Sequence, residues 1–324
     1  MLFIKILSTA LFFYTLVEKA GLFSEQAPSL RAIFHSYPFL GGFSALAIAC
    51  AWQSFPRGRV RKPAIYGRCL LVAGALLAMT GLWVSYLTYF EGHVLRMDKQ
   101  DFLTLPGEYT EGTSHQGKLA KPNSIGIYIK EISFRKIPFM HTPLAQADIR
   151  YISKGQKAFA DTTISRIRPL YKDWTMVRVT GSGYSVAYAL NDQTDREVDR
   201  TYVALKLSPP GEEDYFSPKD FGYYFHIRYY PDYYDANGQP ATRSLEQKNP
   251  MLGVRVVRNK DILYNGLVSM NNTLDIEGVR FRIKDVRPCV EITVIRDPGL
   301  PVLLAGLLLA MAGVCMLLPA REKK

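Results

Sequence analysis

Two different hydrophobic patterns divide the chain. Toward both ends, apolar residues form continuous runs, and a helix that crosses a bilayer needs about 20 such residues. The runs cover residues 2–17, 38–55, 70–90 and 299–318. They predict four transmembrane helices. The run at 2–17 is short and contains Lys5, so it is either a retained helix or a signal peptide, although no small-x-small cleavage site follows Val17.

The middle of the chain alternates between apolar and polar residues, which is typical of strands with one buried face. Such runs begin at Ile125, Val203, Tyr223, Leu252, Val279 and Val290. Turn sequences separate them, among them residues 209–211, 235–238 and 276–278. The pattern predicts a β-rich domain, either a sandwich or a partly open barrel.

These two patterns give three regions. Residues 1–90 hold three helices with short loops, residues 91–298 form the β-rich domain, and residues 299–324 form the last helix and a tail. Asp297 and Pro298 stand where a helix N-cap and first turn are expected. The last strand should therefore continue into the last helix with almost no linker.

Charge predicts the orientation. The whole chain has a net charge of +11, but residues 91–298 carry 29 basic and 26 acidic residues, a net charge of only +3. Most of the excess lies in the loop at 56–68 and in the tail after Leu318, and basic loops stay in the cytoplasm. We expect a multi-pass protein of the cytoplasmic (inner) membrane, in contact with membrane lipid, with its large domain on the outer, periplasmic side. The β-rich domain has no basic cluster, which argues against nucleic-acid binding.

The cysteines exclude several kinds of site. The chain has four, Cys50, Cys69, Cys289 and Cys315, and no Cys-x-x-Cys pair. A thioredoxin-like site, a zinc ribbon and covalent haem attachment in the usual way are therefore excluded. Cys289, the single cysteine of residues 91–298, is either a reactive thiol or a packing residue of a strand. We find no constellation of catalytic residues, so a non-catalytic subunit is favoured over an enzyme.

Several segments resemble the ResB family of cytochrome c biogenesis proteins. The junction ITVIRDPGLPVLLAGLLLAMAG (292–313) is similar to the end of that family, and FHSYPFLGGFSALAIACAW (34–52) is similar to its second helix. EGHVLRMDKQD (91–101), TISRIRPLYKDW (163–174) and KNPMLGVRVV (248–257) are similar to later stretches. The resemblance implies System II cytochrome c maturation, in which a CcsA-type multi-span haem-handling partner helps to present haem to apocytochrome c.

One family feature is absent. Family members often carry a histidine near the cytoplasmic end of the third helix, where this chain reads YGRCL (66–70). His93 follows the third predicted helix and His35 precedes the second, so the pair could offer two imidazoles to a haem iron. The alternative is that both are interfacial polar residues, in a scaffold subunit of another membrane redox assembly that holds no haem. The stretch at 223–234 is either an aromatic surface for a porphyrin or partner, or an ordinary core strand.

Overall fold

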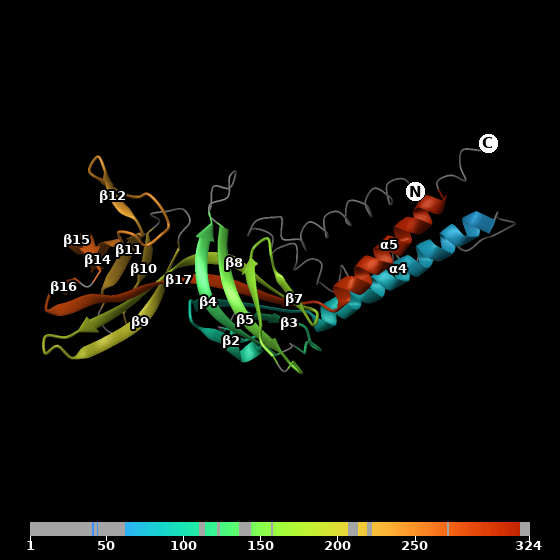
Figure 1. Cartoon of the computed structure of the whole chain (residues 1–324), viewed down its shortest axis with the longest axis horizontal. Helices are drawn as coiled ribbons and strands as arrows, with labels where there is room; N and C mark the ends of the chain where they lie inside the picture. Colours follow the sequence, from blue (N-terminus) through green and yellow to red (C-terminus); the bar gives the residue numbers. More distant parts are fainter. Residues whose placement is uncertain are drawn as a thin grey trace. The chain divides into compact units, whose positions relative to one another are not determined.

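The chain forms two compact units (Figure 1). The computed structural model describes residues 41, 44, 62–109, 114–121, 124–135, 144–156, 158–206, 213–218, 222–270 and 272–317. One unit contains the described helices with residues 115–121, and the other contains residues 91–114 and 122–295. The predicted helix at 2–17 lies outside the described residues, as does nearly all of the one at 38–55.

Two described helices are long and apolar enough to cross a membrane. They are α4 (Lys62–Thr88) and α5 (Gly299–Leu317), which lie side by side (Figure 1). The prediction for the third helix was wrong at both ends, because α4 begins eight residues earlier than residue 70 and Phe90 belongs to a strand. The second half of the predicted basic loop, from Lys62 to Arg68, therefore belongs to α4. Arginine and lysine are good helix formers, and Pro63 suits a first helical turn.

Glycine sets the distance between these helices. Gly67, Gly74 and Gly81 on α4 and Gly299, Gly306 and Gly313 on α5 recur every seven residues. A Cβ atom built on any of these glycines except Gly67 would lie less than 3.0 Å from backbone atoms of the opposite helix. Gly67 faces Gly313, Gly74 faces Gly306 and Gly81 faces Gly299, so the helices are antiparallel and their backbones touch. Small residues allow this close approach of membrane helices.

Asp297 joins the two helices chemically. One carboxylate oxygen accepts a hydrogen bond from the Leu300 N–H at 3.1 Å, which confirms the predicted cap of α5. The other accepts a hydrogen bond from the Ser85 hydroxyl of α4 at 3.0 Å. Both side chains are buried. Because the helices are antiparallel, residues 89 and 298 emerge at the same end of the pair.

The second unit confirms the predicted β-rich domain. Within the described residues, one sheet of seven strands has the order β3-β1-β17-β8-β7, with β16 on β17 and β9 on β8. These strands are β1 (Phe90–Met97), β3 (Ser114–Gln116), β7 (Leu170–Lys172), β8 (Thr175–Asn191), β9 (Glu197–Lys206), β16 (Thr273–Ile276) and β17 (Val279–Arg296). Figure 1 shows β8 and β17 as long strands that run through the domain.

Two further sheets and a hairpin complete the described part of this unit. One sheet contains β10 (Asp214–Phe216), β11 (Tyr224–Tyr230), β14 (Met251–Arg258) and β15 (Asp261–Ser269). The other contains β2 (Asp101–Leu103), β4 (Ile125–Arg135), β5 (Leu144–Ser153) and β6 (Ala160–Ser165). The hairpin is β12 (Tyr233–Ala236) with β13 (Gln239–Thr242), and η1 (Pro106–Glu108) is a short 3-10 turn.

The alternating runs face the core as predicted. Phe225, Ile227 and Tyr229 of β11 are buried together with Leu252, Val254 and Val256 of β14. Tyr188 of β8 and Phe281 of β17 pack into the same cluster, which joins the seven-stranded sheet to the sheet of β10, β11, β14 and β15. The inward side of residues 223–229 is therefore core, as the second interpretation of that stretch required.

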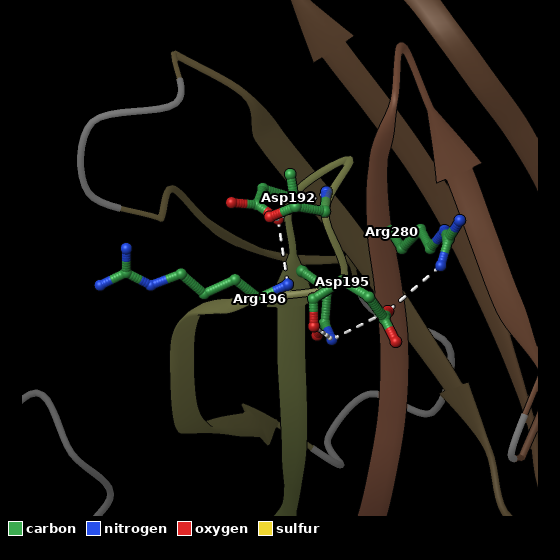
Figure 2. Close-up of polar contacts among 6 residues, drawn as sticks. Asp192, Asp195, Arg196 and Arg280 are labelled. Carbon is green, nitrogen blue, oxygen red and sulfur yellow. Dashed lines mark hydrogen bonds and ion pairs between the residues drawn. The ribbon is translucent and has the colours of Figure 1, made fainter.

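A turn at the end of the β8–β9 hairpin is held by aspartates (Figure 2). The Asp192 carboxylate accepts hydrogen bonds from the Thr194 hydroxyl at 2.6 Å and the Arg196 N–H at 3.0 Å, which lower the pKa of Asp192. Asp195 has a φ of +63°, and its carboxylate receives a hydrogen bond from Arg280 of β17 at 3.1 Å. The turn therefore fixes the hairpin register and links it to β17.

Candidate functional site

His93 is the sequence-predicted site residue that the structure describes. It lies on β1, five positions after the last residue of α4, between buried Gly92 and Val94. Its side chain is 37% exposed, so the imidazole ring packs on the sheet and is still accessible to solvent. His35 lies outside the described residues. The expected meeting of the two imidazoles therefore stays a prediction.

The strand order explains the neighbours of His93. Strand β17 lies between β1 and β8, so side chains from three strands form one polar row. The His93 Nδ1 atom is 2.9 Å from the hydroxyl of Thr293 on β17, and that hydroxyl is 2.8 Å from the hydroxyl of Thr180 on β8. Thr293 is completely buried. Packing and hydrogen bonding together fix the orientation of the imidazole.

Two carboxylates flank the ring. The Glu91 Oε1 atom lies 3.7 Å from Nε2 of His93, and the Glu291 Oε1 atom lies 3.7 Å from Nδ1. Glu91 is buried, whereas the Glu291 side chain is 45% exposed. Both distances are too long for good hydrogen bonds. The carboxylates would attract any cation that approached the imidazole, because opposite charges this close interact appreciably at a protein surface.

This geometry fits one histidine ligand of a haem iron. A histidine that binds a metal commonly has its other ring nitrogen held by a hydrogen bond, which fixes the tautomer and the ring orientation. If Nδ1–H donates to the Thr293 hydroxyl, Nε2 keeps its lone pair for a ligand. Among the described residues there is no group of three or more histidine, cysteine or acidic side chains that could hold a metal ion.

Cys289 is buried within β17, and its thiol packs near Gly183. This burial raises the pKa of the thiol to about 12. A thiol that does not ionise near neutral pH is a poor nucleophile and a poor metal ligand. The geometry therefore favours the packing role over the reactive one.

Sequence reasoning missed the partners of His93. Thr293 follows His93 by 200 positions, and no local pattern predicts that β1 pairs with β17 rather than with another strand. The helix contact could have been found, since the seven-residue spacing of Gly67, Gly74 and Gly81 matches that of Gly299, Gly306 and Gly313. A comparison with models of known protein families found no match, and neither did a comparison with curated proteins.

Proposed function

We propose that this chain is a ResB-like membrane component of cytochrome c biogenesis. It spans the cytoplasmic membrane with four helices and carries its β-rich domain on the outer side. There it supports haem delivery to apocytochrome c together with a CcsA-type partner. The observation that carries the proposal is the His93 row, in which an accessible imidazole is oriented by the buried Thr293 hydroxyl.

The connections between the helices and the sheet also support it. Strand β1 begins two residues after α4 ends, and β17 ends three residues before α5 begins. These two strands are neighbours in the seven-stranded sheet. We expect the haem ligand of a haem-delivery subunit to lie close in sequence to a membrane span. His93 fits this expectation, because it is five positions after the last residue of α4.

Deletion of the gene tests the role. The mature c-type cytochromes should fall in a deletion strain, measured by covalent haem staining, and should return when the wild-type chain is supplied. A His93→Ala chain should fold and assemble, because the ring is partly exposed. If His93 supplies an iron ligand, the haem absorption band of the purified complex with its partner should shift or weaken in that variant.

Orientation is tested separately. Asn237 is exposed in the turn between β12 and β13 and has a positive φ. In a chain whose own cysteines are replaced by serine, Asn237→Cys should react with a membrane-impermeant thiol reagent in intact cells. Labelling that requires broken cells would place the domain in the cytoplasm and reject this proposal.

The alternative is a scaffold subunit of another membrane redox assembly without haem of its own. The specific observation in its favour is that residues 66–70 contain no histidine. Normal levels of every c-type cytochrome in the deletion strain, together with a defect in another membrane redox complex, would select this alternative.

A further inference from the structure

The sheet of β10, β11, β14 and β15 presents a polar face opposite its core. Along β11 the side chains alternate, so Phe225 and Ile227 point into the core while His226 and Arg228 point outward. The register places His226 opposite Arg255, which in turn lies opposite Asn265. One row of this face thus carries a histidine, an arginine and an asparagine from three strands.

A groove of about 600 Å³ opens on this face. Its lining includes the backbones of Gly253 and Gly266, and the hairpin of β12 and β13 contributes Gln239 and Pro240. Gly253 lies two positions before Arg255 on the same face of β14 and has no side chain, which leaves space next to Arg228 and Tyr230. Arg228 and Arg255 both line the groove. The groove therefore combines space with two guanidinium groups.

Among the described residues that line the groove, two arginines share one carboxylate, that of Glu213. The Oε2 atom of Glu213 lies 2.8 Å from Nη2 of Arg255 and 3.9 Å from Nη2 of Arg228. His226 lies just beyond, with its Nδ1 atom 3.8 Å from the same oxygen. One carboxylate is thus shared between two arginines, and the Arg228 side chain is still 50% exposed.

Arg255 has an unused donor. Its Nη2 atom binds Glu213, but its Nε atom is buried and has no hydrogen-bond partner among the described residues. The Nε and Nη2 hydrogens of arginine lie along one edge of the guanidinium and together match the two oxygens of a carboxylate or phosphate. A buried donor without a partner costs stability. Glu213 uses only half of this edge.

We infer that the groove binds a small oxyanion, a carboxylate or a phosphate group, which takes both donors of Arg255 and displaces Glu213. Arg228 supplies the second positive charge. Glu213 is an internal competitor that holds Arg255 in place and lowers the affinity for external anions. No bond is made or broken in this exchange. The inference is independent of the haem role, because none of the residues of the His93 row lines the groove.

The test uses the full-length protein purified in detergent at low ionic strength. Inorganic phosphate and succinate are titrated separately by calorimetry, so the tighter of the two identifies the preferred group. We expect Arg255→Gln to weaken binding by at least about tenfold, as for loss of a charge-assisted hydrogen bond. Glu213→Gln should strengthen binding, because it removes the competing charge. Arg150→Gln is the matched control, since Arg150 pairs with Asp161 on the sheet of β4, β5 and β6.

Each outcome of these titrations either supports the inference or overturns it. If Arg255→Gln does not fold, Arg228→Gln takes its place, because within the described part of the chain the ion pair of that exposed side chain is the long one with Glu213. Weaker binding in the arginine variant and tighter binding in Glu213→Gln would support the inference. Equal affinity in the arginine variant and in Arg150→Gln would overturn it, as would no binding of either anion to the wild type or to Glu213→Gln.

Discussion

Replacing Gly306 by alanine tests whether backbone contact holds α4 and α5 together. The added Cβ would lie 2.7 Å from Ala78 Cα and 2.8 Å from the Gly74 carbonyl oxygen, whereas ordinary contact begins at 3.4 Å. The backbone N atom of Ala78 is nearer still, so the helices would have to separate by more than about 0.7 Å, which forfeits a quarter to a half of the attraction between the atoms in contact. Overpacking of this kind costs about 1–3 kcal/mol.

The direction of the change in stability distinguishes a close helix contact from its absence. In a helix without such a contact, glycine to alanine stabilises by about 1 kcal/mol. We therefore expect the melting temperature of the purified protein in detergent to fall by several degrees, at about 2–4 °C for each kcal/mol in a protein of this size class. Size-exclusion chromatography after heating a fluorescent fusion protein would measure it. A graded series with valine and leucine should cause larger losses.

Gly107→Ala is the matched control, because a Cβ at this position meets nothing within 4 Å and Gly107 does not have a positive φ. It should leave the melting temperature unchanged or slightly raise it. If Gly306→Ala behaved like Gly107→Ala, or if valine and leucine were no worse than alanine, the close contact between the helices would be refuted.

Three other changes have defined outcomes. Asp297→Ala removes both the cap of α5 and the acceptor for Ser85, so we expect a loss of about 2–4 kcal/mol in unfolding free energy, whereas Ser85→Ala should lose about 1 kcal/mol; equal losses would contradict the double role. In a chain whose other cysteines are serine, Cys289 should react with iodoacetamide at pH 8 only after unfolding, because burial raises the pKa of its thiol to about 12; fast labelling of the folded protein would show that the thiol is accessible. The pKa of Asp192 is lowered in the folded state, so ionised Asp192 stabilises the fold above the ordinary pKa of about 3.9, and this stabilisation is lost as the pH falls below that value. The difference in urea midpoint between the wild type and Asp192→Asn should therefore be larger at pH 7 than at pH 3.

The sequence predicted the parts of the fold that depend on local patterns. Alternation located β4, β11 and β14, since a strand with one buried face repeats every two residues. Asp297 located the start of α5, since a carboxylate at that position caps the free N–H groups of the first turn. In both cases the cause lies within a few residues of the effect.

The rest depends on contacts between distant residues. Hydropathy marks the apolar part of a helix, so the polar first turns of α4 were missed. The alternating runs that begin at Val279 and Val290 were predicted separately, yet β17 is one strand that contains both, and within it the Pro288 carbonyl accepts a hydrogen bond from the Asp98 N–H at 3.4 Å. The polar row at His93 requires β17 beside β1, and the groove at Arg255 requires a three-strand register. No single segment carries that information.

The equal glycine spacing of α4 and α5 has a consequence for how the helix pair finds its register. Sliding one helix by seven residues, about 10.5 Å along the axis, would again place glycine opposite glycine at two of the three levels. The glycines alone therefore permit more than one alignment. The Ser85–Asp297 hydrogen bond forms in only one of them, so this buried polar pair favours the native register over the other alignments that the glycines permit.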